Sequence, residues 1–264
     1  MPQDHVPHKP VPPEQDQARR RRPWPDDLPP QYMHDFGLAT TLVLAMVALV
    51  LGQAAGVCAV AVAGRSLAPA AVDGTGVALF HLVSMPVQVI TLVLAVRMTD
   101  ARLFDYLGIS LPSRREIEVA AAGMMILITA GDIVTFVSGH ALVPAYDIAI
   151  HRTALAEGML LPLWFALIIL LPAGEELLLR GFLFRGFVRN PMTSVPGVLT
   201  IALIWTLLHM QSDDVVANLL LFLVSAYLGV IRLVSGSTTL VILIHVLWSL
   251  ESVLETTIAL GWVF

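Results

Sequence analysis

The sequence has few charged residues and almost no cysteine, and both shortages limit what the protein can be. Only 13% of its 264 residues are charged, 57% are hydrophobic, and the mean hydropathy is +0.80. Soluble domains carry about 25% charged residues, so this composition excludes an ordinary soluble protein and indicates several membrane crossings. The single cysteine, Cys58, excludes an intrachain disulfide and a cysteine-based metal site, and we expect it to pack as a small apolar residue.

The first 32 residues differ in composition from the rest. They hold 9 of the 17 prolines and the basic run Arg19–Arg22. Such a composition cannot bury a core, so residues 1–32 are predicted to be a disordered Pro/Arg-rich cytoplasmic tail. We interpret the four arginines as a topology signal and weak lipid anchor, and expect no nucleic-acid partner. Residues 33–264 are predicted to form one transmembrane helical domain.

The remaining chain divides into apolar segments long enough for a hydrocarbon core of about 30 Å. They predict an all-α polytopic bundle of about seven spans, within a range of six to eight. The fourth segment is long and could break at Pro172-Ala-Gly174, and the connection over 140–160 could hold a further partial helix. The predicted spans are 37–62, 77–98, 118–139, 160–188, 195–210, 214–232 and 237–258.

The positions of the basic residues predict the orientation of these spans. With a cytoplasmic N-terminus, thirteen arginines and lysines fall inside and two, Arg65 and Arg152, fall outside. This bias agrees with the positive-inside rule. We therefore expect an integral protein of the cell membrane, in contact with the bilayer, with its C-terminus outside.

Three charged residues stand in the middle of the fourth apolar segment: Glu175, Glu176 and Arg180. A charge at the bilayer centre costs about 2.5–3.5 kcal/mol, so such groups are usually paired, hydrated or catalytic. Glu176 and Arg180 are four residues apart and share a helix face. Glu175 is turned about 100° away, which predicts one carboxylate held by arginine and another presented to a cavity.

Two histidines lie at a similar depth in later spans. Trp205 and His209 share one helix face, as do His245 and Ser249. A single histidine on an apolar helix is more often a packing residue. Two imidazoles and a carboxylate at one depth, however, can polarise water and stabilise an oxyanion.

The order and spacing of these residues resemble the CPBP intramembrane proteases, also called the type II CAAX prenyl endopeptidase or lysostaphin-resistance-protein-A-like family. The family's first motif, two glutamates, three residues and arginine, is matched by Glu175, Glu176 and Arg180. Its second motif is an aromatic residue, usually phenylalanine, followed by three residues and then histidine. Trp205 and His209 match this motif with a different aromatic residue.

The third motif of the family is histidine, three residues, and asparagine or aspartate. His245 matches, but Ser249 occupies the last position. The resemblance covers about residues 155–258, which would form the catalytic core around an intramembrane active-site cavity. The N-terminal half contributes only generic membrane helices.

The resemblance implies an enzyme, an intramembrane endopeptidase that hydrolyses a peptide bond of a protein or peptide substrate in or at the membrane. Glu175 would activate water with the help of His209, while Glu176 and Arg180 would orient it. His245 and the residue at 249 would stabilise the oxyanion. Ser249 offers a hydroxyl but not the two N–H groups of an amide, and losing an oxyanion donor can cost about 10²–10³ in rate.

Two alternatives remain open for metal binding. Glu175, His209 and His245 could supply three ligands to a Zn²⁺ ion, the number that catalytic zinc prefers. They could equally hold only water, and the sequence contains no His-Glu-x-x-His motif. We expect metal-independent activation of water and no other cofactor.

Two other functions fit the same bundle. Ser249 favours a non-catalytic protein of the same fold, acting in bacteriocin immunity or as an adaptor. A proton-linked transporter could instead use Glu175 and Asp132 as relay groups. No internal repeat is visible in the sequence, which disfavours the transporter.

Overall fold

The computed structural model describes residues 36–66, 68, 73–210 and 214–262. The predicted tail, residues 1–32, lies outside this part of the chain. All regular secondary structure in the described residues is helical, and no strand occurs among them. Seven helices there are long and apolar enough to cross a membrane, which confirms the predicted fold class and number of spans.

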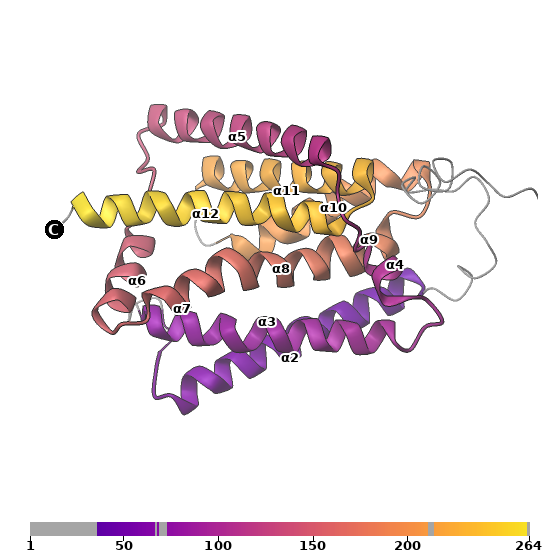
Figure 1. Cartoon of the computed structure of the whole chain (residues 1–264), viewed down its shortest axis with the longest axis horizontal. Coiled ribbons are helices and arrows are strands. Elements are labelled where there is room, and N and C mark those ends of the chain that lie inside the picture. Colours follow the sequence, from indigo (N-terminus) through magenta and orange to yellow (C-terminus); the bar gives the residue numbers. More distant parts are fainter. Residues whose placement is uncertain (1–35, 67, 69–72, 211–213, 263–264) are drawn as a thin grey trace, which may run out of the picture.

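Six spans are single helices whose ends lie close to the predicted ones. They are α2 (Leu38–Val62), α3 (Gly74–Val96), α5 (Arg114–Val137), α10 (Pro191–His209), α11 (Val215–Ser235) and α12 (Thr238–Trp262). Two shorter helices lie between spans, at opposite ends of the bundle (Figure 1): α4 (Leu103–Leu107) and α6 (Ala145–Ala156). Helix α6 is the partial helix considered for residues 140–160.

The fourth span is continuous but irregular. Its consecutive segments are α7 (Leu160–Phe165), η3 (Ala166–Leu170), α8 (Leu171–Glu176), η4 (Leu177–Leu183) and α9 (Phe184–Phe187), of which η3 and η4 are π-helical. The break considered at Pro172 is wrong, because the backbone remains helical there. Pro172 lacks an N–H, and the π-helical turn η3 just before it is the kind of local adjustment that lets a spanning helix continue through a proline. π-Helical turns are rare and often occur at functional sites, and here they flank both glutamates.

The irregular fourth span lies in the interior of the bundle. Its segments contact α2, α3, α6, α10 and α12, and Figure 1 shows α8 between α3 and α12. Helices α5, α11 and α12 pack together through one apolar cluster, which includes Met124, Leu228 and Ile244. A second cluster joins α2, α3, α4, the fourth span and α10 around Leu92, Phe182 and Trp205.

Side-chain caps fix where several of the spans begin. Ser113 and Glu116 form a capping box at the start of α5, and Asn190 and Thr193 form another at the start of α10. Asp214 accepts hydrogen bonds from the first backbone N–H groups of α11. These polar side chains satisfy N–H groups that a helix leaves unpaired, so each span starts at a defined residue.

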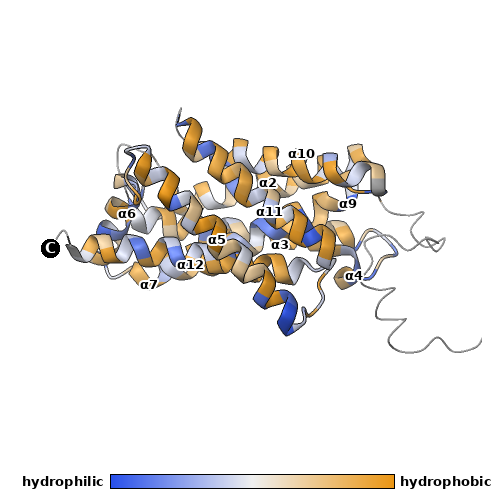
Figure 2. Ribbon diagram, turned by 90° about the horizontal axis from the view of Figure 1, so that it is seen from above, coloured by the Kyte–Doolittle hydropathy of each residue, from blue (hydrophilic) through white to orange (hydrophobic). Residues whose placement is uncertain are grey.

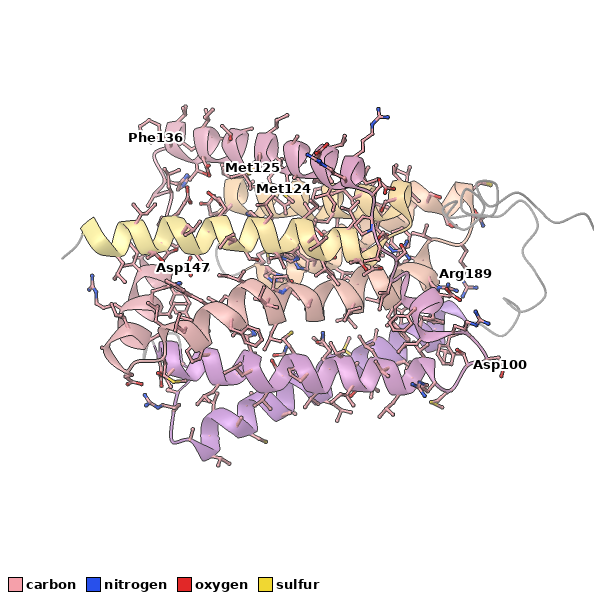
Figure 3. All side chains as sticks on the ribbon, viewed as in Figure 1. Asp100, Met124, Met125, Phe136, Asp147 and Arg189 are labelled. Atoms are coloured by element: carbon pink, nitrogen blue, oxygen red, sulfur yellow. The ribbon has the colours of Figure 1, made fainter. Side chains whose placement is uncertain are left out.

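The outer surface of the spans is apolar, as a surface against lipid requires. Hydrophobic residues cover most of the length of the helices (Figure 2), and on α5 Met125 and Phe136 are exposed whereas Met124 is enclosed (Figure 3). The expectation that Cys58 packs in the core is wrong, because its side chain is exposed on α2. A small apolar residue is equally suited to contact with lipid, so composition alone could not decide its orientation.

Candidate active site

Glu176 and Arg180 form an ion pair that is completely buried. Both side chains are 0% exposed, and Arg180 Nη1 donates to the two oxygens of Glu176 at 2.8 and 3.0 Å. Arg180 Nη2 donates to the backbone oxygen and the hydroxyl of Ser225 on α11, both at 2.6 Å. The predicted pairing of Glu176 with Arg180 is therefore present, and Ser225 anchors it to a second helix.

A histidine from the last span completes this buried centre. His245 Nδ1 donates to Glu176 Oε1 at 2.8 Å, since a carboxylate only accepts. Arg232 Nε on α11 donates to the backbone oxygen of Arg180 at 2.9 Å, which links the same segment to α11 once more. A buried charge is tolerated when it is paired and hydrogen-bonded, and Glu176 meets both conditions.

Glu175 has different partners from those of Glu176. Its Oε2 accepts a hydrogen bond from Trp205 Nε1 at 2.8 Å, and its Oε1 lies 3.2 Å from His209 Nε2. The side chains of Glu175 and His209 are 14% and 30% exposed, whereas that of Glu176 is 0% exposed. Glu175 is therefore the carboxylate that a water molecule or a substrate can reach, as the helix period predicted.

The hydrogen bonds of His209 determine where a proton must lie. Its Nδ1 donates to the backbone oxygen of Trp205 at 2.9 Å, so its Nε2 is the nitrogen left for Glu175. A carboxylate oxygen and this nitrogen can form a hydrogen bond only with a proton between them. Glu175 and His209 are therefore arranged to exchange one proton over a short distance.

Two tryptophans hold both histidines in place. The Trp205 ring lies 4.2 Å from the His209 ring and 5.9 Å, edge to face, from the His245 ring. Trp248 stacks on His245 at 5.5 Å and lies 5.8 Å from Trp205. These contacts fix the ring planes and join the Glu175 and Glu176 halves of the site into one unit.

The position of Glu175 depends on a close approach between two helices. The sulfur of Met85 on α3 lies 2.6 Å from the point where a Cβ on Gly174 would stand. Gln88, one turn further along α3, donates from Nε2 to the backbone oxygen of Gly174 at 3.0 Å. A larger residue at 174 would force the Met85 side chain to move and would disturb the packing of α3 on the turn that carries Glu175.

Ser249, the sixth predicted site residue, differs from the other five in its hydrogen bonding. It stands one helical turn after His245 on α12, and its hydroxyl forms no hydrogen bond with any residue in the described part of the chain. The other five predicted residues, Glu175, Glu176, Arg180, His209 and His245, lie together. His245 binds Glu176, however, so the three residues considered as metal ligands do not share one contact point.

One acidic group in the described residues does bring three potential ligand atoms within 4.8 Å of one another, but it contains none of the six predicted site residues. It consists of Asp132 on α5 and Glu251 and Glu255 on α12. Asp132, which the transporter alternative would use as a relay group with Glu175, therefore lies with two other carboxylates. A separate groove of about 550 Å³ lies between α5 and α11, and none of the six predicted site residues lines it.

Three contributors to the site escaped the sequence analysis. Gln88 and Ser225 are small polar residues in apolar spans, and nothing in their spacing shows which helix they face. The role of Trp205 as a donor could have been found, because it replaces the usual phenylalanine with a ring that carries an N–H group. The structure shows that this N–H reaches Glu175.

Comparison with known protein families agrees with this geometry. Residues 157–250 match the family described as type II CAAX prenyl endopeptidase Rce1-like. Over this segment the chain is similar to that family. The match contains all six predicted site residues and confirms the resemblance stated from the three motifs. The Rce1-like family consists largely of proteases. Comparisons with curated proteins and with solved structures gave no significant match.

Proposed function

We propose that this Rce1-like protein is an intramembrane endopeptidase that cleaves a peptide bond of a protein or peptide substrate. The observation that carries the proposal is the contrast between two adjacent carboxylates. Glu176 is enclosed and neutralised by Arg180, whereas Glu175 is accessible and held by Trp205 and His209. A purely structural ion pair would explain Glu176 but not Glu175.

In the proposed mechanism Glu175 is the general base. It takes a proton from a water molecule, whose oxygen attacks the carbonyl carbon of the scissile peptide and turns the carbonyl oxygen into an oxyanion. The carbon–nitrogen bond then breaks, and the proton passes through Glu175 or His209 to the leaving amine. General acid–base catalysis of this kind contributes about 10²–10⁴-fold to a rate.

The buried Glu176–Arg180 ion pair positions the histidine that faces the substrate. Glu176 accepts a hydrogen bond from Nδ1 of His245. With this carboxylate as counter-charge, the ring in its protonated form can also donate from Nε2 to the substrate oxygen. Arg180 and Ser225 hold Glu176 so that it cannot turn toward the substrate. Fixed dipoles around a developing charge are usually the largest contribution to catalysis, because they need no reorganisation.

The proposed mechanism uses no metal ion. If Zn²⁺ were bound, Glu175, His209 and His245 would hold it and it would supply an activated water molecule. Their ligand atoms do not converge within 4.8 Å, and His245 Nδ1 and Glu175 Oε2 already have other partners. We therefore expect cleavage to persist after dialysis against a strong chelator, and its loss and recovery with added Zn²⁺ would contradict this part of the proposal.

We further propose an N-terminus in the cytoplasm and a C-terminus outside. Arg102 is the N-cap residue of α4, Arg114 and Arg115 stand in the first turn of α5, and Arg185 stands on α9. These helix ends lie at the same end of the bundle (Figure 1). The positive-inside rule assigns that end to the cytoplasm. A substrate in or at the membrane would then reach Glu175 from within the bundle.

The test of the proposed function is cleavage by the purified protein in nanodiscs. The probes are a farnesylated CAAX peptide, which the family name suggests, and the same peptide without the lipid. Glu175→Gln and His209→Ala are expected to reduce cleavage about 10²–10⁴-fold. Glu118→Gln, an exposed carboxylate in the first turns of α5, is the matched control and should cleave normally. Activity that survives both site substitutions would overturn the mechanism.

A non-catalytic function is the second candidate, because Ser249 lacks the amide of the family motif. In that case the protein would bind a peptide partner without cutting it. Full biological activity of the Glu175→Gln variant in cells would favour this function over the protease.

A further inference from the structure

His81 on α3 has a buried nitrogen with no partner. Its Nδ1 is enclosed and has no hydrogen-bond partner. Its Nε2 is less enclosed and also forms no hydrogen bond with the described residues. A polar group inside a membrane-spanning helix is costly unless it has a partner or a function. The one ring contact of His81 in this part of the chain, an edge-to-face contact with Phe80 at 5.0 Å, does not satisfy either nitrogen.

The face of α3 on which His81 lies is directed at the fourth span. Val77, four residues before His81, packs in the apolar cluster that contains Leu163. Met85, four residues after it, contacts Gly174. Residues four apart share a helix face, so His81 faces the π-helical segment η3 that leads to Glu175.

The electrostatic interactions of His81 agree with this placement. The His81 ring interacts with the charges of both Glu175 and His209. These are the two residues assigned to the activation of water. His81 therefore approaches, from a third helix, the side of the site that is accessible.

A comparison with another histidine shows why placement matters more than burial. His151 on α6 also has an enclosed nitrogen without a partner, Nε2, while its Nδ1 donates to the backbone oxygen of Asp147 at 2.8 Å. An unpartnered nitrogen alone thus does not indicate a site. His81 differs because neither of its nitrogens is satisfied and because it lies on the face of α3 that is directed at the segment leading to Glu175.

We propose that His81 is a further catalytic residue, which donates a hydrogen bond from Nε2 to the carbonyl oxygen of the bound substrate. The chain needs such a donor because Ser249 replaces the family's amide with a short hydroxyl. With Nδ1 enclosed and without a donor, the neutral ring carries its proton on Nε2 and offers it to a ligand. This role rests on the proposed endopeptidase function.

The first experiment measures kcat and KM of His81 variants with the farnesylated CAAX peptide. His81→Phe keeps a ring without a donor and is expected to lower kcat about 10²- to 10³-fold, with little change in KM. His81→Gln places an amide N–H near the position of Nε2 and should restore most of kcat, whereas His81→Asn, which reaches only the position of Nδ1, should not. His151→Phe is the matched control and should keep a normal kcat.

The outcomes separate the two proposals. If the wild-type protein cleaves but His81→Phe cleaves equally well, the role of His81 is wrong and the proposed function stands. A loss of kcat that His81→Gln does not restore would also contradict the donor role. If the wild-type protein cleaves neither peptide, the proposed function fails and the role of His81 fails with it.

A second experiment tests the placement of His81 without any activity. In a Cys58→Ala background, the chain has no other cysteine, so a single introduced thiol can be followed. His81→Cys should react with a small charged thiol reagent faster than Met85→Cys, since Met85 is only 4% exposed. Equal rates would show that position 81 is as enclosed as position 85 and would overturn the proposal.

Discussion

Two groups of carboxylates lie within the membrane-spanning helices, and they are compensated in different ways. Glu175 and Glu176 are surrounded by an arginine, two histidines and an indole N–H group. The second group, Asp132, Glu251 and Glu255, forms no ion pair with a basic residue in the described part of the chain. Acidic residues in apolar helices therefore do not by themselves mark a catalytic site, and their partners distinguish the two groups.

The location of each group explains the difference. The Glu175 and Glu176 pair stands on the central fourth span, where α10, α11 and α12 supply partners. The acidic group joins only α5 and α12, and all three of its members are partly accessible. A partly accessible carboxylate can remain hydrated, whereas an enclosed one needs a counter-charge.

Removing Arg180 should have the largest effect on stability. Arg180→Leu leaves Glu176 as an enclosed charge without its counter-ion, which typically costs about 3–5 kcal/mol. Chemical denaturation of the purified protein in detergent would measure this loss. Arg115→Leu, at an exposed position at the start of α5, should remain close to the wild type. Equal stabilities of the two variants would show that the enclosed Glu176 does not need Arg180 as its counter-charge.

The next largest effect is expected from loss of the hydrogen bond to Glu175, the accessible carboxylate. Trp205→Phe keeps an aromatic ring against His209 but removes the hydrogen bond to Glu175. Hydrogen bonds to charged groups contribute about 1.5–3 kcal/mol, so cleavage should fall about tenfold to a hundredfold. Trp248→Phe is the matched control, since Trp248 stacks on His245 but forms no hydrogen bond to a described carboxylate. A decrease of the same size in both variants would assign the effect to packing.

Substitutions in the second acidic group should have little effect. Asp132→Asn combined with Glu251→Gln removes repulsion between neighbouring carboxylates and breaks no ion pair. The free energy of unfolding is expected to stay within about 0.5 kcal/mol of the wild type or to rise, and cleavage should be unchanged. A large loss of either would show that this group has a cation partner or takes part in the reaction.

The smallest effect concerns an ion pair outside the spans. Arg65 Nη1 lies 2.7 and 2.6 Å from the two oxygens of Glu157, and Thr75 donates to the same carboxylate at 2.6 Å. The hydrogen bonds from Arg65 and Thr75 hold the pKa of Glu157 below its ordinary value. The stabilisation is therefore complete above the pKa of the unfolded chain and is lost as the pH falls through the folded pKa.

Melting temperatures across acidic and neutral pH would measure this contribution. Glu157→Gln should melt below the wild type at neutral pH, and the difference should disappear at low pH. Asp100→Asn, at a loop position without an ion pair in the described residues, serves as control. A difference that persists unchanged at low pH would show that the charge of Glu157 is not its cause.

The helices and much of the site were predictable from local regularities. Seven apolar segments of sufficient length gave the number of spans, because lipid excludes unpaired backbone groups and leaves helices as the simplest solution. The four-residue spacing gave the Glu176–Arg180 pair and the shared face of Trp205 and His209, both of which are present. These relations lie within single helices, so the 3.6-residue period determines them.

The relations between helices were harder to predict. Equal depth suggested that His245 would join Glu175, but His245 binds Glu176. Asp132 on α5 lies beside Glu251 and Glu255 on α12, a grouping that the sequence did not predict. Depth along a span can be counted from the sequence, whereas the rotation of one helix toward another depends on packing. For the same reason the sequence could not predict that the face of α3 carrying His81 is directed at the fourth span.

The sequence by itself determined a seven-span helical membrane protein, an Rce1-like motif order, and the division of two adjacent glutamates between two helix faces. These features depend on hydropathy, spacing and the helical period, which act along the chain. Only the tertiary structure decided which histidine meets which glutamate and that Trp205 donates to Glu175. Those contacts join residues from separate spans, and the irregular fourth span at the centre of the bundle brings them together.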